Sequence, residues 1–354
     1  MQLHNYYNSF RYKKIKTLTV LLINFAFITL SSSKALATEF PKVKTECVND
    51  SELCSKSIQH ENSYELSFYN NTAHVLTVDF SYTALNYDVA HALTQTFTIA
   101  PAETVPVFET YVNDVNAYSE LTWNSTYEHG DFEATHDDDY IYTLPYQAGE
   151  EYLVSQGFNG AYSDSEGANQ YSVDFVMDAG TPILAARAGK VVKVAESSSL
   201  GGTSSFYYGK ANFVVIEQSD GTHAEYFHLK QYGALVEVGD LVEVGQKIGL
   251  SGNTGFSSGP HLHFSITSPV SGSEMKSYPF AFEAFSGVVT EPLVGFYYTS
   301  VTELYTPAPI DPNIMAKKKS SSSAGSVHWL FLMTLGIVLL ASKKRRIYDS
   351  KKKC

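Results

Sequence analysis

The sequence predicts an all-β protein built from two successive β domains. Short runs of residues alternate between apolar and polar side chains and are rich in Val, Ile, Phe and Tyr, a pattern typical of strands. Aromatic residues make up 14% of the 354 residues, including 25 Tyr and 21 Phe, and these side chains favour pleated sheets. A content of 44% hydrophobic and 18% charged residues indicates a globular chain that is long enough for two ordinary domains.

Charge is unevenly distributed along the chain. The formal net charge of the whole sequence is −12. Residues 1–37 carry five basic and no acidic side chains, and residues 317–354 carry ten basic side chains and one acidic, so the residues between them carry −26. A segment this acidic repels DNA and anionic lipid headgroups, and we therefore expect no nucleic-acid partner.

The first 37 residues have the composition of a secretory signal peptide. Basic residues occur at positions 11, 13, 14 and 16, and an apolar stretch follows from Thr17 to Leu30. Ala35-Leu36-Ala37 has the A-x-A form of a cleavage site. Because the apolar stretch is short for a membrane span, we expect residues 1–37 to direct export and to be removed, rather than to stay as an anchor.

Residues 38–145 are predicted to form an accessory domain that resembles a β-sandwich. Tyr64–Tyr69 and Val75–Tyr82 are expected to be strands on either side of the turn residues Asn70-Asn71, and Thr94–Ile99 is expected to be another. Short alternating strands separated by turn signals are typical of sandwiches. This segment carries no catalytic signature, so we expect it to position the chain or to cover a substrate groove.

Two clusters within this segment have a chemical interpretation. Cys47 and Cys54 are close together in the sequence, and in an oxidising compartment they form a small-loop disulfide. His129, His136 and the run Asp137–Asp139 suggest a cation site, but their spacing matches no known cation loop. A solvated acidic loop is the preferred interpretation of that run.

Residues 146–270 carry the motifs on which a functional prediction depends. The segment Gly259-Pro260-His261-Leu262-His263 follows a Gly- and Ser-rich turn and continues into an apolar strand pattern. Side chains two residues apart on a strand point the same way, so His261 and His263 are expected to share one face, an arrangement that suits a metal. His228 and Tyr226 have the same spacing on another expected strand.

The order of these motifs resembles the lysostaphin-type (M23, LytM-type) peptidoglycan metalloendopeptidases. The resemblance runs from about Gln156 to Ile266 and consists of DF, GTP, AxxGxV, YFHL, VGDLVEVGQKIG, SGNTG and GPHLHF in this order. It implies a small antiparallel β domain with one Zn²⁺ at the floor of a groove. It also implies that Asp174 and His263 are metal ligands, and that His228 and His261 are catalytic histidines that act on the water and the scissile carbonyl.

This chain departs from the family pattern at the first metal ligand. The family commonly has a His four residues before the aspartate, and here that position is Gln170. Some members have a longer spacing and a Phe-Ser-His context, which residues 160–167 resemble with Asp164 in place of the His. A carboxylate is a known zinc ligand. Two readings stay open, in which either Asp164 serves as an unusual third ligand or the site is degenerate.

The loop at residues 196–210 is small, polar and rich in Ser and Gly. In the family that this chain resembles, such a loop walls the substrate groove. A tolerated surface insertion explains its composition equally well.

The C-terminal part divides into an extension, residues 271–316, and a tail, residues 317–354. The tail contains a Lys- and Ser-rich linker, the apolar run Val327–Ala341 and the basic cluster Lys343–Arg346. This order is similar to the C-terminal sorting tails of Gram-negative bacteria, in which a short transmembrane segment holds the protein until a protease removes it. The expected location is the periplasm, the outer membrane or the cell surface, with a membrane anchor that is later removed.

These features predict a secreted hydrolase, a zinc-dependent endopeptidase that cleaves peptide cross-links of bacterial peptidoglycan. The alternative is a degenerate, non-catalytic M23-fold protein that binds the cell wall or activates a cell-wall amidase. A purely structural or adhesive surface protein accounts for the N-terminal segment and the tail but not for the histidine motifs. The expected partners are therefore peptidoglycan, an amidase in the alternative reading, and the membrane through the C-terminal tail.

Overall fold

The computed structural model describes residues 20–24, 41–48, 51–89, 96–160 and 167–306. Within these ranges the regular structure consists of strands and one short 3-10 helix, η1 (Ser205–Tyr207), so the all-β prediction is confirmed. The chain divides into two compact units, Met1–Tyr305 and Thr306–Cys354. The predicted tail lies outside the described residues, and within the described part no helix has the length and apolar character of a membrane span.

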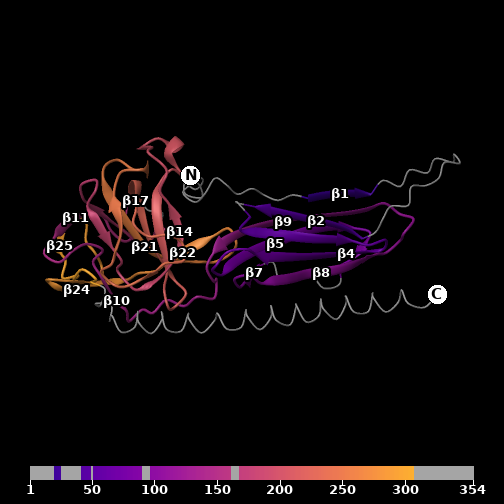
Figure 1. The fold of residues 1–354 in the computed structure, drawn as a ribbon, viewed down its shortest axis with the longest axis horizontal. Coiled ribbons are helices and arrows are strands. Elements are labelled where there is room, and N and C mark those ends of the chain that lie inside the picture. The colour runs from indigo at the N-terminus through magenta and orange to yellow at the C-terminus, as the bar shows by residue number, and fades with distance from the viewer. Residues whose placement is uncertain (1–19, 25–40, 49–50, 90–95, 161–166, 307–354) are drawn as a thin grey trace, which may run out of the picture. The chain divides into compact units, whose positions relative to one another are not determined.

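Two sheets build the N-terminal part of the first unit (Figure 1). One is five-stranded and has the order β2-β3-β4-β8-β6, with bounds Lys42–Val48, Leu53–Gln59, Ser63–Asn70, Thr104–Val112 and Tyr87–Asp88. The other is four-stranded and has the order β1-β9-β5-β7, with bounds Val20–Asn24, Ser119–His129, Leu76–Leu85 and Thr96–Ile99. All their pairings are antiparallel.

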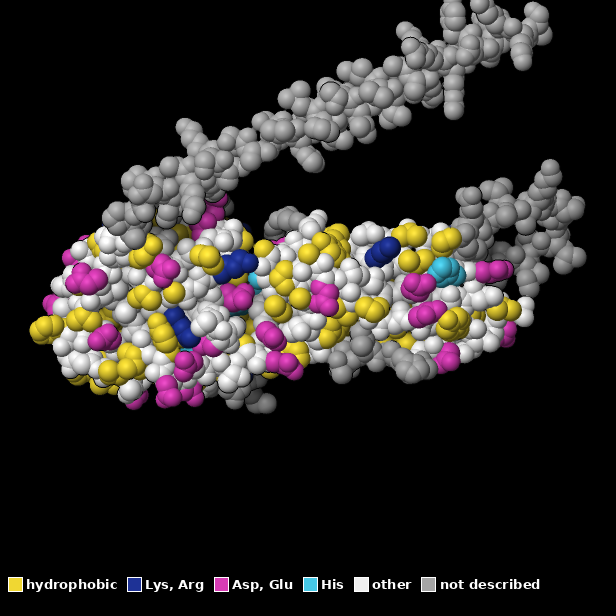
Figure 2. All heavy atoms as spheres, turned by 60° about the horizontal axis from the view of Figure 1, so that its bottom comes forward, with side chains coloured by type: hydrophobic (Ala, Val, Ile, Leu, Met, Phe, Trp, Pro, Cys, Tyr) yellow, Lys and Arg dark blue, Asp and Glu magenta, His cyan; other side chains and the backbone are white. Residues whose placement is uncertain are grey.

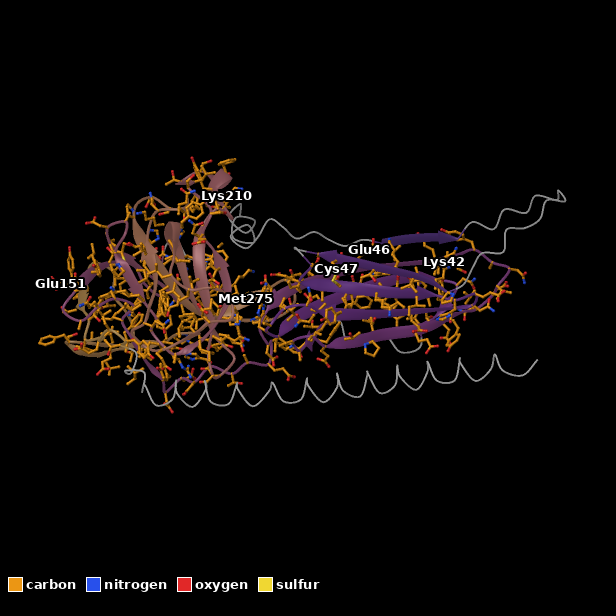
Figure 3. The ribbon with its side chains drawn as sticks, in the orientation of Figure 1. Lys42, Glu46, Cys47, Glu151, Lys210 and Met275 are labelled. Atoms are coloured by element: carbon orange, nitrogen blue, oxygen red, sulfur yellow. A yellow bond between two sulfur atoms is a disulfide. The ribbon has the colours of Figure 1, made fainter. Side chains whose placement is uncertain are left out.

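One hydrophobic core joins these two sheets. Burial alternates strictly along β4, where Tyr64, Leu66 and Phe68 are inside, as the period of a strand with one covered face requires. The same core takes Phe80 from β5 and Trp123 from β9. The disulfide Cys47–Cys54 joins directly paired residues of β2 and β3 (Figure 3), and the predicted pairing of these cysteines is confirmed.

The strand β1 lies within the apolar stretch that the sequence assigns to a signal peptide. Val20–Asn24 pairs antiparallel with β9 along all five of its residues. The rest of residues 1–40 lies outside the described residues. Removal of residues 1–37 would therefore take away one neighbour of β9, and the signal peptide itself stays a prediction.

An eleven-stranded sheet forms the second part of the first unit. Its main path is β18-β14-β16-β17-β21-β12-β11-β25, with bounds Leu241–Val242, Gly189–Ala195, Asn212–Glu217, His223–Ala234, His261–Pro269, Ser172–Val176, Glu151–Gln156 and Tyr297–Thr299. Off this path lie β13 (Pro182–Leu184), β19 (Lys247–Ser251) and β22 (Met275–Ser277). The pairings along this path are antiparallel.

Two small sheets complete this part. The first has the order β10-β23-β24, with bounds Ile141–Thr143, Ala281–Ala284 and Gly287–Val289. The second is the parallel pair β15 (Gly201–Gly202) and β20 (Gly255–Phe256).

The core behind the large sheet extends beyond residues 146–270 on both sides. Its fully buried side chains include Val173, Phe175, Tyr226 and Phe264 from the central strands. Residues before and after the predicted boundaries join the same core, namely Tyr142, Leu144, Phe280, Phe282 and Ala284. The segment that precedes residue 146 is therefore part of this core and not only a connection to it. The predicted domain boundaries themselves stay predictions.

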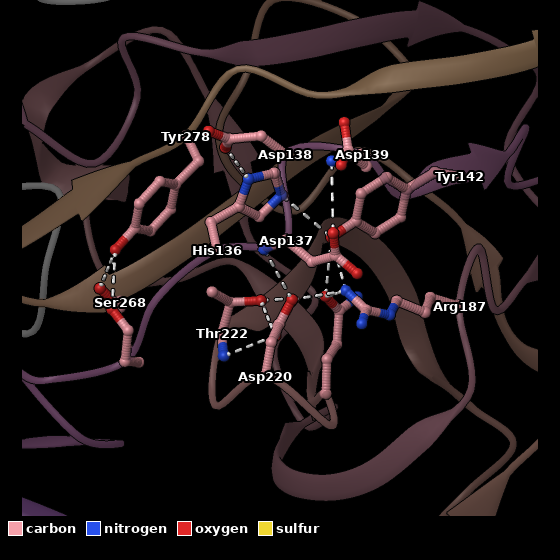
Figure 4. Close-up of polar contacts among 12 residues, drawn as sticks. His136, Asp137, Asp138, Asp139, Tyr142, Arg187, Asp220, Thr222, Ser268 and Tyr278 are labelled. Carbon is pink, nitrogen blue, oxygen red and sulfur yellow. Dashed lines mark hydrogen bonds and ion pairs between the residues drawn. The ribbon is translucent and has the colours of Figure 1, made fainter.

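A buried polar network attaches that preceding segment to the sheet (Figure 4). Arg187 donates from Nη1 to Asp220 Oδ2 at 2.6 Å, and its guanidinium lies 4.0 Å from the centre of the Tyr140 ring. The Tyr142 hydroxyl donates to Gln218 Oε1 at 2.8 Å. Because a buried ion pair is tolerated only when its remaining donors and acceptors are bonded, this network holds the segment in one position.

The same network decides between the two interpretations of the acidic run. His136 is buried, its Nδ1 lies 2.8 Å from Asp138 Oδ1, and its ring stacks on Tyr278 at 5.0 Å. Asp137, Asp138 and Asp139 are exposed. The run is thus a solvated acidic loop next to a structural histidine, as preferred from the sequence.

Candidate metal and peptidase site

The candidate site lies on three neighbouring strands of the large sheet. Strand order places β21 between β17 and β12, and the register pairs His263 with Asp174 on one side and with Phe227 on the other. Directly paired residues point to the same face, so Asp174 and His263 are brought together from positions 89 residues apart. His261 is two residues before His263 on the same strand and shares this face, as the sequence predicts.

An irregularity in strand β17 places the His228 side chain in the site. Regular alternation would place His228 and Tyr226 on one face, and this expectation is wrong. Tyr226 is in the core and accepts a hydrogen bond from the Ala186 amide at 2.9 Å. The backbone of His228 has φ 64°, and the pairing of β17 with β19 shifts register after Leu229, so both Phe227 and His228 lie 6.0 Å from the His263 ring, centre to centre. A residue with positive φ reverses the usual alternation at that point.

The four side chains form one cluster. His263 Nδ1 lies 2.9 Å from Asp174 Oδ1, and His261 Nε2 lies 3.8 Å from Asp174 Oδ2. The rings of His228 and His261 are 4.6 Å apart, centre to centre. The structure therefore gathers all four of these predicted site residues, whereas the fifth, Asp164, lies outside the described residues. Their chemical roles stay predictions.

A backbone carbonyl orients each of the two histidines predicted to be catalytic, His228 and His261. His228 Nδ1 is 2.7 Å from the Thr254 carbonyl oxygen, and His261 Nδ1 is 2.8 Å from the Gly259 carbonyl oxygen. Since a carbonyl only accepts, Nδ1 of each ring carries a proton, and Nε2 is the nitrogen that is left to exchange one. Ser257 adds a contact of 3.2 Å between its Oγ and His261 Nδ1.

These orienting groups were not identified from the sequence. They belong to the Gly- and Ser-rich segment between β19 and β21, whose composition indicates only a turn. Gly252 pairs with His261 at the end of this segment, and a Cβ at Gly252 would lie 2.4 Å from the Lys230 amide nitrogen. The glycine is therefore needed for the close approach of the two chains.

The pKa values of Asp174 and His228 are both lowered in the site, for different reasons. Burial raises the pKa of Asp174, but the hydrogen bond with His263 and the nearby rings of His261 and His228 outweigh this, so its pKa is below the ordinary value. Burial lowers the pKa of His228 to about 3, and His261 and His263 add to this effect. At neutral pH the site therefore holds a carboxylate beside a neutral His228 ring.

The described side chains supply part of a zinc site. Two ligands on one tetrahedral zinc, each at about 2.0 to 2.1 Å, lie roughly 3.3 Å apart, and the His263 Nδ1–Asp174 Oδ1 distance of 2.9 Å is close to this. No third His, Cys, Asp or Glu joins them as a ligand within the ranges that the structure describes. The spacing of Asp174 and His263 thus suits two ligands of one zinc, and Asp164 as the third ligand stays a prediction.

Gln170, at the position of the family's first ligand, has a structural contact instead. Its Nε2 donates to Asn159 Oδ1 at 3.1 Å, and its carbonyl oxygen accepts from the Asn159 amide at 2.7 Å. The side chain amide therefore ties the start of β12 to the turn that follows β11.

The loop at residues 196–210 lies against the segment that orients His228 and His261. Its β15 pairs with β20, and the Tyr208 ring lies 4.5 Å from the Phe256 ring. Phe256 is two residues from Thr254, whose carbonyl binds His228. The loop is therefore next to the site, which is the position that the groove-wall interpretation requires.

Comparison with known proteins identifies the part of the chain that carries this cluster. Residues 168–276 match the model of Peptidase family M23. These residues therefore resemble an M23 peptidase domain, and they are called the M23 domain below. The matched range includes β12, β17 and β21, and with them Asp174, His228, His261 and His263.

Several curated proteins resemble the M23 domain. Glycyl-glycine endopeptidase ALE-1 of Staphylococcus capitis is 44% identical over 99 residues, which is 28% of this chain and 24% of that protein. Lysostaphin of Staphylococcus simulans is 38% identical over 99 residues, 28% of this chain and 18% of that protein. Peptidoglycan DD-endopeptidase ShyA of Vibrio cholerae is 39% identical over 93 residues, 26% of this chain and 19% of that protein. The chain thus spans a quarter or less of the length of these relatives.

Solved structures resemble the same region. The catalytic domain of lysostaphin from Staphylococcus simulans is 32% identical and aligns with 36% of this chain and 87% of its own, with a TM-score of 0.26. A second lysostaphin structure is 35% identical and aligns with 36% of this chain and 47% of its own, with a TM-score of 0.28.

Proposed function

We propose that this protein is an exported, zinc-dependent endopeptidase that cleaves peptide cross-links in peptidoglycan. The observation that carries the proposal is the pairing of Asp174 with His263 at 2.9 Å, with His261 and His228 beside them. The names of the relatives, a glycyl-glycine endopeptidase and a peptidoglycan endopeptidase, support the substrate class. A domain that only bound its ligand would have no chemical need for this cluster.

Each side chain has a role in the proposed reaction. Asp174 and His263 would hold the zinc, with Asp164 as the third ligand. When bound, the zinc supplies a Lewis acid that lowers the pKa of a coordinated water. His228 and His261 are left with Nε2 for the reaction because their Nδ1 atoms are bonded to carbonyls. One ring, in its neutral form, accepts a proton from the attacking water at Nε2. The other stabilises the tetrahedral oxyanion in the form that also carries a proton on Nε2, since only an N–H group donates a hydrogen bond to it.

Zinc content and cross-link cleavage test this proposal together. A third ligand that is a carboxylate makes the site more anionic than one with a second His, so the coordinated water is less acidic. We expect the wild type to bind one zinc weakly and to cleave slowly. Asp164→His should bind zinc more tightly and cleave cross-linked muropeptides at least several-fold faster, as metal analysis and chromatography of digests would measure.

Two further variants make the result interpretable. His263→Ala should lose both zinc and cleavage because it removes a ligand. His60→Ala should lose neither, since His60 lies in the N-terminal part and bonds only Glu65 among the described contacts. If the wild type holds no zinc at micromolar metal and Asp164→His changes nothing, the peptidase proposal is wrong.

A second candidate function is a non-catalytic cell-wall protein. Gln170 favours it, because this residue occupies the first ligand position and bonds Asn159. In that case the domain binds peptidoglycan or activates a cell-wall amidase without a metal. Binding of metal-free protein to purified sacculi, without cleavage by the wild type or by Asp164→His, would be the outcome that supports it.

The proposal places the protein outside the cytoplasm. The basic, apolar and A-x-A pattern of residues 1–37 supports export, and the apolar run with its basic cluster near the C-terminus supports a transient membrane anchor. Mass spectrometry of the mature protein should find neither residues 1–37 nor Arg345 and Arg346. A mature chain that begins at Met1 contradicts export, and one that retains Arg346 contradicts removal of the tail.

A further inference from the structure

The outward face of the sheet continues beyond the site as a row of paired residues. His261 of β21 pairs with Val176 of β12, Val176 pairs with Leu153 of β11, and Leu153 pairs with Tyr297 of β25. Directly opposed residues in antiparallel strands point to the same face. These four side chains therefore form one row that runs across four neighbouring strands from the catalytic cluster.

The neighbouring residues confirm which face this is. Phe175 and Val154 are fully buried, and Tyr152 and Tyr298 pack against the same core. The intervening residues of each strand consequently face away from the core. Val176 is 42% exposed and Tyr297 is 62% exposed, so the row is open at both of these positions.

The row has the dimensions and the composition of a peptide subsite. Strands are about 4.8 Å apart, so three steps from His261 to Tyr297 cover roughly 14 Å, the length of about four extended residues. Val176 and Leu153 are aliphatic, and Tyr297 ends the row with an aromatic ring. Next to Tyr297 on the same face, Thr299 bonds Glu151 at 3.3 Å, and Glu151 is labelled in Figure 3.

Half of this row lies outside the part of the chain that matches the family. β11 and β25 precede and follow residues 168–276, so Leu153 and Tyr297 lie outside the matched residues. Tyr297 belongs to the predicted C-terminal extension, to which the sequence assigns no role.

We infer that the row Val176–Leu153–Tyr297 is the subsite that binds one peptide arm of the substrate and sets its specificity. This inference rests on the proposed function, because the row begins at His261. Aliphatic side chains and an open aromatic ring take up small aliphatic side chains of an extended peptide. Glu151 at the end of the row repels acidic groups. The occupant is therefore an uncharged peptide segment with small aliphatic side chains.

Three variants of the full chain test this subsite. Tyr297→Ala and Val176→Ala remove apolar surface from the row at exposed positions, where folding is least affected. Phe285→Ala is the matched control, because Phe285 is an aromatic residue that is 80% exposed and is not part of the row. The measurements are KM and kcat on cross-linked muropeptides, and sedimentation of the protein with purified peptidoglycan sacculi.

We expect Tyr297→Ala and Val176→Ala to raise KM by roughly three- to tenfold and to leave kcat within about twofold, because the row binds a remote part of the substrate. Both should also sediment less with sacculi, and Phe285→Ala should behave as the wild type. If the wild type binds sacculi but does not cleave them, sedimentation alone tests the subsite: both row variants should sediment less than the wild type, and Phe285→Ala should sediment equally.

Other outcomes overturn the inference. Unchanged KM and sedimentation in both row variants, while the wild type binds or cleaves, contradict the subsite and leave the proposed function intact. An equal loss in Phe285→Ala shows a non-specific surface effect and also contradicts the subsite. If the wild type neither binds nor cleaves peptidoglycan, the proposed function and this inference are both wrong.

Discussion

His228 shows how one residue combines backbone strain with a possible catalytic position. Its φ of 64° lies in the left-handed region, which costs a residue with a Cβ roughly 1 to 2 kcal/mol. The hydrogen bond from Nδ1 to the Thr254 carbonyl and the packing of a fully enclosed ring hold it there. Strained residues of this kind persist only where the surrounding structure holds them in place, and they cluster at functional sites.

This strain predicts a difference between two substitutions. Asn tolerates positive φ better than other residues with a Cβ, whereas a β-branched residue does so least. His228→Val should therefore be less stable than His228→Asn by about 1 to 3 kcal/mol, measured as the free energy of unfolding in urea. Both variants should lose cleavage, because neither carries an imidazole. Equal stability of the two variants would show that the backbone at this position relaxes without strain.

At the scale of elements, the segment around β10 belongs energetically to the M23 domain. Tyr142 and Leu144 are fully buried in the core behind the large sheet. Arg187 and Asp220 form a buried ion pair beneath them, with Tyr140 over the guanidinium. A domain that is cut at the predicted boundary would expose this core. The Arg187 guanidinium would also lose the Tyr140 ring that covers it.

Two truncated chains test the contribution of this segment. A chain of residues 146–306, cut at the predicted boundary, loses Tyr142 and Leu144. Removal of each large buried side chain costs roughly 2 to 5 kcal/mol, which is comparable to the stability of a whole domain. We expect it to be unfolded or to melt at a much lower temperature than a chain of residues 130–306, as measured by circular dichroism. If the two chains melt at the same temperature, the segment contributes little.

At the scale of the whole molecule, buried histidines make stability depend on pH. The N-terminal core borders a buried histidine pair, in which His74 Nε2 and His129 Nδ1 are 2.5 Å apart. Burial lowers the pKa of His74 to about 3 and that of His129 to about 4, with Lys193 adding to the shift of His129. Glu52 contacts His129, and although burial raises its pKa, its bonds with His129 and Tyr127 bring it to about 2.

The direction of the pH dependence follows from these shifts. Below a pH of about 6.5, the ordinary pKa of histidine, both histidines are protonated in the unfolded chain but stay neutral in the folded protein. The free energy of unfolding therefore falls as the pH falls. We expect a loss of about 2 kcal/mol for each histidine between pH 7 and pH 5, in unfolding experiments with urea. Glu52 adds a further loss below about pH 4.5.

The double variant His74→Gln, His129→Gln isolates this effect. Its loss of stability between pH 7 and pH 5 should be about 4 kcal/mol smaller than that of the wild type. The loss that is left comes from His228, whose pKa burial also lowers to about 3. The control His60→Gln should keep the wild-type dependence. A double variant with the full acid sensitivity of the wild type would place the titrating groups elsewhere in the molecule.

Charge is the property of the whole molecule that composition predicts most directly. The face drawn in Figure 2 carries many acidic side chains and few basic ones. This agrees with the charge of −26 between residues 37 and 317, and it disfavours polyanionic partners such as nucleic acid.

The sequence by itself determined the all-β architecture and most of the candidate site. Period-two alternation is local, so strands such as β4 and β21 were recognisable without any partner. The spacing of His261 and His263 placed them on one face for the same reason. The motif order around Asp174 and His228 added the family, which the match of residues 168–276 bears out.

Only the tertiary structure decided how these strands pair and what they enclose. Pairing joins residues as distant as Leu153 and Tyr297, and local alternation contains no information about such partners or their register. The reversal at His228 depends on a left-handed backbone that no residue type in YFHL signals. Tyr142 and Phe282 entered the core from outside the recognised motifs, because burial is a property of the assembled sheets rather than of the segment that carries the side chain.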